Sequence, residues 1–371
     1  MYRHSSRHAR HVRACVGSLV FSVCATSASG VRVDPIDVFD RAVAHGLPRT
    51  VTFADRGIRA RDAAGGGQLT IIEVLDVDVR FSDDSVATMY AATWDGAPAF
   101  VTRSADHLDI TVTAPHGVRV TGFARDHAGS HAMELPGSPP DDAAARRSRR
   151  SVAIASPEGG ETSSPSTQNP HEGVSTAGFY MYLHDDLRGV SEKHVHAGYV
   201  AWWVAGMRRT LAVSKIQAVY RRDIKGLTDL PYGYETALDD WTVAAEAQAE
   251  RDGLLSIDGR AWFKHMLITS GMPIPGAHGQ AWVRGDQAIA SIRGPYSVIA
   301  HEFGHTLSAS HEAAEIDWSN VWPCETNLYP YANALRSNCY RFTPANERRM
   351  RDYMAGAWHA DPVGGKFEKV K

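Results

Sequence analysis

The chain has 371 residues, of which 43% are apolar and 22% are charged, and its formal net charge at pH 7 is -3. This length suits two domains, each long enough to bury a core of its own. Nothing in this charge balance indicates the basic domain or stripe that marks most nucleic-acid binders, so we expect no nucleic-acid partner.

Residues 1–28 are expected to be a signal peptide. Arginines from Arg3 to Arg13 precede an apolar stretch, Ala14 to Ala25, and small residues follow. This order is typical of a secretory signal and places the cut near Ala28. An uncleaved anchor is the alternative, but a membrane span needs about 20 apolar residues. We therefore expect a secreted protein, extracellular or periplasmic, without stable membrane insertion.

The cysteines also indicate export. Cys15 and Cys24 lie in the expected signal, which leaves Cys324 and Cys339 in the rest of the chain. A pair of cysteines in an exported protein predicts a disulfide. Closing a loop of this length would stabilise the fold by roughly 3 kcal/mol. Two free thiols are the alternative.

Residues 29–134 are expected to form a β-rich pro- or accessory domain. Short runs rich in Val, Ile, Thr and aromatic residues are separated in several places by Gly, Asp or Pro, which is typical of strands. From Leu75 to Phe81 apolar and polar residues alternate, which predicts a half-buried strand. The expected strands are Val51–Phe53, Leu69–Phe81, Ala87–Trp94, Ala99–Thr102, Leu108–Thr113 and Val118–Phe123.

Residues 135–173 have the composition of a disordered linker. They are rich in Pro, Ser, Gly and Thr, and they are too polar to pack into a core. Within them lies a basic run, Arg146-Arg147-Ser148-Arg149-Arg150. It is either a processing site, since proteolytic nicking concentrates in exposed linkers, or a solvated charge run.

From residue 174 to residue 371 the sequence predicts an α+β domain. Apolar residues from Ser191 to Leu211 recur at helical spacing, with Ser191 as the N-cap. A second helix, Thr236–Arg251, ends at Gly253, and a third begins at Pro295, a residue favoured in the first helical turn. The expected strands are Gly178–Leu183, Lys215–Tyr220, Lys264–Thr269, Gly279–Arg284 and Ala288–Ile292.

The helix that begins at Pro295 carries the motif His301-Glu302-Phe303-Gly304-His305, and His311 follows it. His301 and His305 are four residues apart and therefore share one face of the helix. Their imidazoles can converge on one ion, at about 2.0–2.1 Å for zinc. The opposite face would pack against the sheet through apolar residues, namely Ile299, Phe303 and Leu307.

Glu302 can reach a water on the metal without binding the metal itself. Zinc lowers the pKa of such a water to about 7, so the carboxylate can take its proton and later pass it to the leaving amine. Three protein ligands leave the fourth position open, as in catalytic sites. We therefore predict His301, His305 and His311 as zinc ligands and Glu302 as the catalytic residue. Histidines without a metal are the alternative, which the third histidine disfavours.

The sequence from His301 to His311, HEFGHTLSASH, resembles the extended zinc signature of the metzincin metallopeptidases. The likeness extends more loosely over residues 174–360. It implies an α+β fold, a twisted, mostly parallel five-stranded sheet with long helices, here preceded by the β-rich domain. It also implies a cleft beside an edge strand, Gly279–Arg284, which would pair with an extended peptide substrate.

The sequence departs from the family pattern in two places. Ser308 stands where the family usually has a glycine that ends the helix, and a left-handed Ser costs on the order of 1 kcal/mol. The family also has a methionine in a turn beneath the metal. Met350 and Met354 lie in a stretch, 343–357, that reads as a helix with Thr343 as N-cap.

The turn is instead expected at Ser337–Tyr340, which contains no methionine. Tyr340 either supports the metal or the reacting oxyanion, or simply packs, and packing is the favoured interpretation. Glu312, directly after the third histidine, is expected to pair with a cation near the site.

Three smaller motifs are expected to be structural. Arg284-Gly285-Asp286 spells an integrin-binding tripeptide but is predicted to be a turn beside a strand. His194 and His196 are two residues apart on a helix, so they point in different directions and do not form a second metal site. Asp185 and Asp186 offer calcium ligands, although solvated loop carboxylates are the commoner case.

The leading functional hypothesis is a zinc endopeptidase that acts on proteins or peptides and is made as a preproprotein. The β-rich segment would assist folding or keep the enzyme latent until a cut near Arg150. Residues 29–323 contain no cysteine that could cap the zinc, so latency would need a carboxylate, a histidine or steric cover.

The alternative keeps the zinc fold but makes the β-rich domain a permanent binding module for a surface or polymer. A zinc-fold binding protein without catalysis is a third interpretation, against which the presence of Glu302 argues.

Overall fold

The computed structural model describes residues 34–53, 67–114, 117–126, 129–134, 152–155, 176–255, 261–319, 322–330 and 336–355. The chain divides into a unit of residues 1–33 and a compact unit of residues 34–371. The expected signal peptide and the basic run at 146–150 lie outside the described residues. Within the described residues, none of the helices has both the length and the apolar character to cross a membrane.

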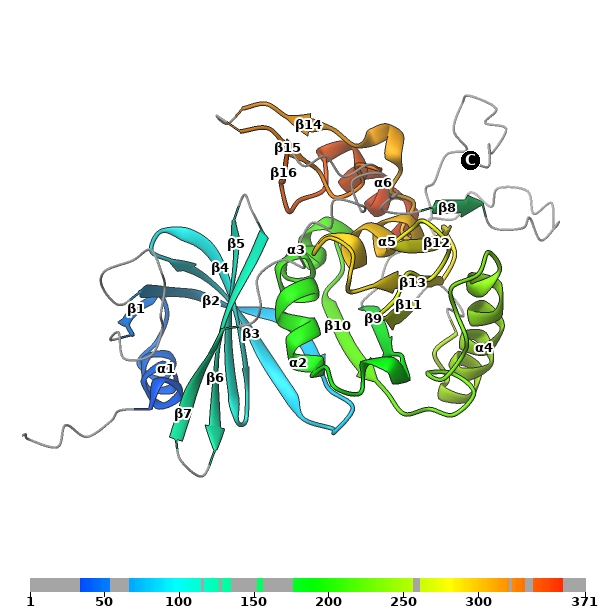
Figure 1. The fold of residues 1–371 in the computed structure, drawn as a ribbon. Helices are drawn as coiled ribbons and strands as arrows, with labels where there is room; N and C mark the ends of the chain where they lie inside the picture. The colour runs from blue at the N-terminus through cyan, green and yellow to red at the C-terminus, as the bar shows by residue number, and fades with distance from the viewer. Residues whose placement is uncertain are drawn as a thin grey trace, which may run out of the picture. The chain divides into compact units, whose positions relative to one another are not determined.

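Figure 1 shows the helices and strands of the described residues. The helices are α1 (Pro35–Ala44), α2 (Glu192–Val195), α3 (Ala201–Leu211), α4 (Ala237–Asp252), α5 (Val298–Thr306) and α6 (Pro344–Met354), with short turns η2 (Asp185–Leu187), η3 (His196–Val200) and η4 (His311–Ala313). The first eight strands are β1 (Arg49–Thr52), β2 (Gln68–Arg80), β3 (Val86–Trp94), β4 (Ala97–Ser104), β5 (His107–Ala114), β6 (Gly117–Asp126), β7 (Gly129–Glu134) and β8 (Val152–Ala155). The others are β9 (Thr176–Leu183), β10 (Lys215–Arg221), β11 (Ala261–Thr269), β12 (Gly279–Val283), β13 (Gln287–Ser291), β14 (Ile316–Asp317), β15 (Cys324–Glu325) and β16 (Ser337–Asn338).

The N-terminal segment is an antiparallel meander in which each strand from β2 to β7 pairs with the next. The six expected strands are present, and the alternation predicted from Leu75 to Phe81 is found, with Val77, Val79 and Phe81 buried. Helix α1 was not predicted. Its sequence signal is Asp34, whose side chain accepts a hydrogen bond from the Ile36 amide, followed by a proline in the first turn.

The C-terminal segment contains the five expected strands in the order β10-β9-β11-β13-β12, parallel except for β12. Neighbouring residues of β9 face opposite sides of this sheet. Phe179 and Met181 pack in a core with α3 and α5, whereas Tyr180 and Tyr182 pack with α4. Helices therefore cover both faces, and α5 lies on the same face as α3.

The two segments share one sheet. Val77–Arg80 of β2 pair in parallel with Ile216–Val219 of β10, so the N-terminal meander continues the mostly parallel sheet. The sequence had predicted a separate β-rich domain over residues 29–134. A pairing between strands so far apart in the chain leaves no local signal, because it depends on edges that meet only in the folded protein.

At the other end of the sheet, β12 is not the edge strand. Val152–Ala155 of β8 pair in parallel with Gln280–Val283 of β12 (Figure 1). This corrects two expectations: part of the supposed linker is a strand, and the edge expected to receive a substrate is occupied. The Val-Ala-Ile-Ala run is short enough to be missed inside a polar segment, and β12 supplies the partner that makes it a strand.

Two helices differ from their expected forms. The helix predicted from Ser191 to Leu211 has its expected N-cap, Ser191, but a π-helical turn, η3, separates α2 from α3. The helix expected to begin at Pro295 begins at Val298 instead, after a turn closed by a bond from the Val298 amide to the Pro295 carbonyl.

The disulfide between Cys324 and Cys339 is present. It joins β15 to the turn after β16, within a small sheet of order β14-β15-β16 that is separate from the large one.

Candidate metal centre

The candidate metal-binding motif, His301 to His305, lies on α5, all nine residues of which are buried. Phe303 packs edge-on against Phe179 of β9, with ring centroids 5.1 Å apart. Its ring also lies tilted against Trp203 of α3, with centroids 5.6 Å apart. Ile299 and Leu307, on the same side, are also buried. The predicted division of the helix is therefore found: an apolar face anchors it to the core, and the opposite face carries His301 and His305.

Ser308 ends the helix in the left-handed conformation, with φ of 75°. The Ser308 amide donates to the His305 carbonyl at 3.0 Å, and the Ala309 amide donates to the Gly304 carbonyl at 2.9 Å. These two bonds define a Schellman motif, in which glycine is the usual left-handed residue. Ser308 thus makes the turn that the family pattern assigns to glycine, and the chain can reverse toward His311.

Helix α6 holds the loop that carries His311. The Asn346 side chain accepts a bond from the Ser310 amide at 2.8 Å and donates one to the Ser310 carbonyl at 3.1 Å. Arg349 donates to the Ser308 carbonyl, and Thr343 to the Ala313 carbonyl. Sequence reasoning missed Asn346, because a buried amide in a first helical turn has no distinctive spacing.

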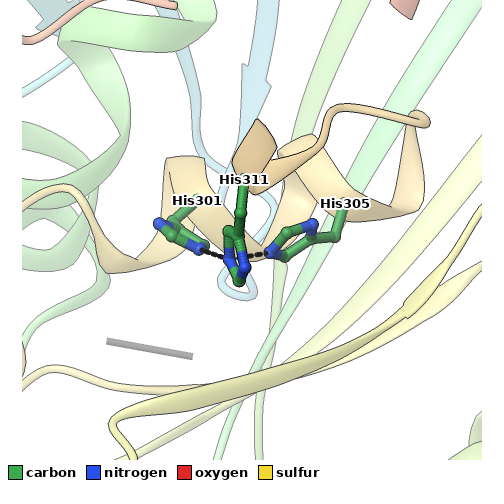
Figure 2. A group of neighbouring side chains, drawn as sticks. All are labelled: His301, His305 and His311. Carbon is green, nitrogen blue, oxygen red and sulfur yellow. Dashed lines mark hydrogen bonds between the residues drawn. The ribbon is translucent and has the colours of Figure 1, made fainter. Parts of the chain in front are cut away.

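The three predicted histidines come together (Figure 2). The Nε2 atom of His311 lies 3.1 Å from Nε2 of His301 and 3.0 Å from Nε2 of His305. Tetrahedral ligands at zinc-to-nitrogen distances stand about 3.3 Å apart, so the separations fit one shared ion. Nδ1 of His305 donates to the Ala309 carbonyl at 3.0 Å, which leaves the Nε2 lone pair directed inward.

Burial favours the neutral form of the His305 and His311 imidazoles. It lowers the pKa of His305 to about 3, with a smaller contribution from His311. Burial also lowers the pKa of His311, against the opposing effect of the nearby Glu312. Neutral imidazole is the form that binds metals. The cluster of His301, His305 and His311 is therefore a candidate metal site.

Glu302 is fully buried beside this cluster, and neither of its carboxylate oxygens has a hydrogen-bond partner among the described residues. Burial raises its pKa well above the usual value. A buried carboxylate without a partner is costly, and such groups are typical of functional sites. This side chain is therefore available to a ligand.

Gly279, the first residue of β12, makes room for that carboxylate. A Cβ atom at position 279 would lie 2.2 Å from Oε1 of Glu302. Sequence reasoning identified the strand but not the need for glycine, because the two residues meet only in the folded protein.

The face of α5 that carries Gly304 is covered by Leu328 and Phe342. A Cβ atom at Gly304 would lie 3.0 Å from each of these side chains. Met350 and Met354 are in α6, as expected, and both are buried in the main core.

Tyr340 has φ of 51° and stacks edge-on against Trp202 at 5.0 Å, in agreement with a packing role. Glu312 was expected to pair with a cation. It is exposed, and it forms no salt bridge in the described part of the chain.

The smaller motifs have structural roles. Arg284-Gly285-Asp286 forms the turn between β12 and β13, and Asp286 pairs with the buried Lys264 at 2.6 Å.

His196 is fully buried, and its Nδ1 lies 2.9 Å from the Tyr220 hydroxyl. Burial lowers its pKa to about 3. Asp185 and Asp186 accept bonds from Thr228 and Ser270, so neighbouring loops satisfy them.

No family model and no curated protein sequence matches the chain. Among solved structures, the fold is similar to that of metalloproteinase-II from Bacteroides fragilis, with a TM-score of 0.52 and 12% sequence identity. The match covers 82% of this chain and 91% of that chain. At this identity the similarity concerns the fold. The chain thus has a mixed α/β fold similar to that of this metalloproteinase, and a histidine cluster that can hold a metal.

Proposed function

We propose that this protein is a secreted zinc-dependent endopeptidase, with Zn²⁺ held by His301, His305 and His311 and Glu302 as the catalytic carboxylate. The observation that carries the proposal is the convergence of three imidazole Nε2 atoms next to a buried carboxylate without a partner. Three nitrogen ligands suit zinc and leave a position open for substrate or water. The metalloproteinase fold supports the same activity.

When bound, zinc supplies Lewis-acid polarisation of the scissile carbonyl and of the attacking water. Glu302 takes the proton of that water and later delivers it to the leaving amine nitrogen. Its enclosure favours this role, because a carboxylate without other hydrogen bonds is free to hold a proton between the two transfers. The Nδ1 bond of His305 to Ala309 keeps that ring oriented throughout.

An extended peptide is the substrate that suits β12. The strand begins at Gly279, against Glu302, and its outer edge offers backbone groups for strand addition. In this structure β8 pairs with this edge. A substrate would therefore have to replace β8, and we propose that β8 contributes to latency.

The position of β8 bears on activation. It begins at Val152, two residues after Arg150. A cut at the basic run would separate residues 29–150 but would leave β8 attached to the catalytic segment. Release of the β12 edge would then require displacement of β8 or a second cut beyond Ala155.

Permanent retention of the β-rich segment, as a module that binds a surface or polymer, is the second candidate. The shared sheet favours it, because removal of β2 would expose the edge of β10. A bond from Thr111 to the Ala197 carbonyl and an ion pair between Asp106 and Lys193 also link the segments. Mass spectrometry of the exported protein separates the two: a mature start at or beyond Ser151 supports removal.

Metal removal tests the peptidase assignment. Treatment with a chelator is expected to lower the cleavage of an unfolded protein such as reduced casein by roughly 100-fold or more, because the carbonyl and the water lose their polarisation. One equivalent of Zn²⁺ should restore the rate. The measurement is the rate at which new amino termini appear. The protein used is one in which β8 has been displaced or removed. Equal rates with and without metal would exclude a zinc peptidase.

Replacing Gly279 with alanine tests the contact with Glu302. The new methyl group would overlap the carboxylate, and a displacement of about 1 Å at a catalytic group can cost on the order of 100-fold in rate. We expect kcat/KM to fall to that extent while zinc content is unchanged. Gly189→Ala is the matched control, since a Cβ atom there has no neighbour within 4 Å. Full activity in Gly279→Ala would mean that Glu302 does not need its present position.

A further inference from the structure

Strand β2 has a gap on one of its edges. β3 pairs with β2 from Leu69 to Arg80, so the other partners of β2 lie on the opposite edge. On that edge β1 pairs as far as Ile71, and the pairing with β10 begins at Val77. Between them no strand of the described residues pairs with residues 72–76, which we call the β2 gap. An unpaired strand edge presents backbone N–H and C=O groups to a new partner.

Two bulges in β2 mark the ends of the gap. The register with β3 shifts between Ile71 and Glu73 and again between Leu75 and Asp78. Bulges bend a strand and end regular pairing. Five residues at about 3.3 Å each give roughly 16 Å, the length of a short strand. Because β1 and β10 flank it, the β2 gap admits one short extended chain and excludes the longer edge of a folded sheet.

A cavity of about 690 Å³ adjoins the β2 gap. Residues 73–77 of β2 form one part of its lining, residues of α3 between Trp202 and Thr210 form another, and Tyr340–Phe342 form a third. Cavities of roughly 300–1,000 Å³ are typical of ligand sites. Glu302 and the three histidines of the candidate metal centre are not among the described residues that line it. A ligand here would therefore occupy a separate place.

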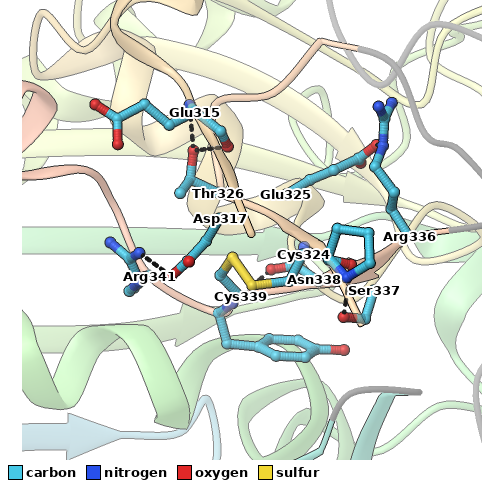
Figure 3. Close-up of a disulfide and its surroundings, with 12 residues drawn as sticks. Glu315, Asp317, Cys324, Glu325, Thr326, Arg336, Ser337, Asn338, Cys339 and Arg341 are labelled. Atoms are coloured by element: carbon cyan, nitrogen blue, oxygen red, sulfur yellow. Dashed lines mark hydrogen bonds and ion pairs between the residues drawn. A yellow bond between two sulfur atoms is a disulfide. The ribbon is translucent and has the colours of Figure 1, made fainter. Parts of the chain in front are cut away.

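The part of the lining formed by Tyr340–Phe342 is firmly held. The disulfide between Cys324 and Cys339 ends directly before it, and Arg341 pairs with Asp317 at 2.7 Å (Figure 3). A site that is formed before its ligand arrives loses less entropy on binding.

Two buried polar side chains in the lining have no hydrogen-bond partner among the described residues. Asn327 is fully buried, and this holds for both its Oδ1 and its Nδ2 atoms. Trp202 is also buried, and the same holds for its Nε1 atom. Buried polar groups are nearly always paired in native proteins, so each exception calls for a partner. A side-chain amide offers a donor and an acceptor, which match the C=O and N–H of a peptide group.

The charges around the cavity balance. Three acidic and three basic residues line it, namely Glu73, Asp76, Glu347, Arg208, Arg209 and Arg341. Asp76 pairs with Arg208 at 2.6 Å. Val74, Leu75 and Phe100 add apolar area to the lining. A ligand with apolar side chains and no net charge therefore fits this cavity.

We propose that the β2 gap binds an extended, uncharged peptide of four or five residues from another protein, which adds to β2 as a strand. Backbone pairing with residues 72–76 holds the peptide. Every second side chain enters the cavity, because neighbouring residues of a strand face opposite sides. Apolar residues at these alternate positions give the selectivity. The site does not depend on the proposed peptidase function.

Fluorescence anisotropy with a labelled heptapeptide tests the proposal. The probe, Ser-Val-Thr-Val-Thr-Val-Ser capped at both ends, has alternating apolar side chains and no charge. The protein is the chain from residue 29 with Glu302→Gln, so that the probe is not cleaved. Saturable binding is expected.

Gly206 of α3 provides the blocking variant, since it lines the cavity and a Cβ atom there has no neighbour within 4 Å. Gly206→Trp fills part of the cavity and should lower the affinity for the probe at least about tenfold. Gly206→Ala is the matched control and should stay within about twofold. Thermal unfolding verifies that each variant is folded.

N-methylation of the probe separates strand addition from apolar contact alone. In an extended peptide the N–H groups of the valines point to one edge and those of the threonines to the other. Methylating one of these two sets should abolish binding, whereas methylating the other should leave most of it.

Three results overturn the proposal: the protein with an unaltered cavity does not bind the probe, Gly206→Trp binds it equally well, or both methylated probes behave alike. Equal binding by Gly206→Trp would place the peptide elsewhere, such as on β12. Binding does not require peptidase activity, so failure of that function leaves the result intact.

Discussion

Glutamine in place of Glu302 is expected to lower kcat/KM by roughly 10²–10⁴-fold, the range that a proton-transfer group contributes, while zinc content stays at the wild-type value. Glutamine has the same shape, so the packing of α5 and the contact with Gly279 are kept. Its amide cannot take a proton from water. The measurements are cleavage of an unfolded protein and metal content of the purified variant.

Two further variants serve as controls for Glu302→Gln. Glu312→Gln removes the same charge from an exposed position next to His311, and it should remain within about twofold of wild type because it touches no reacting group. His305→Ala should lose zinc and activity together. If Glu302→Gln retains activity, the catalytic assignment is wrong. If wild type and variant are both inactive after β8 is displaced, the protein is a zinc-fold binding protein instead.

Disrupting β8 is expected to raise peptidase activity on the order of tenfold or more. Proline lacks the backbone N–H that a strand donates, so Ala153→Pro with Ile154→Pro should release β12 for substrate. A tethered strand has a high effective concentration at its site. The apparent affinity for substrate falls by the fraction of molecules in which β8 is bound. The gain should therefore appear mainly in KM.

The proline variant is compared with protein cut by limited proteolysis at Arg146–Arg150. Because β8 follows the basic run, this cut alone should give a smaller gain than the proline variant, and the two together should give the largest. Ala144→Pro, before the basic run and outside β8, is the matched control and should leave activity unchanged. Full activity after the cut alone would show that the N-terminal segment, and not β8, restrains the enzyme.

Much of the fold follows from local patterns. The alternation from Leu75 to Phe81 predicted β2, and Thr343 with Pro344 predicted the start of α6. Helix α4 ends at Gly253 in the left-handed conformation, as expected. Such signals are readable because strand alternation, capping and helix termination depend on neighbours within a few residues.

The histidine spacing is also a local signal that can be read from the sequence. His301 and His305 share a helix face by geometry alone, and their convergence with His311 was expected before the fold was known. The sequence left the shape of the turn at Ser308 open, and the structure places this residue in the left-handed conformation.

The sequence by itself thus determined most of the helices and strands, the disulfide pair and the candidate site residues. Only the tertiary structure decided that β2 joins β10, that β8 covers β12, that Gly279 makes room for Glu302 and that Asn346 holds the loop of His311. The physical reason is the same in each case. These contacts join residues that are far apart in the chain, and their energies depend on which edges and surfaces meet after the chain has folded.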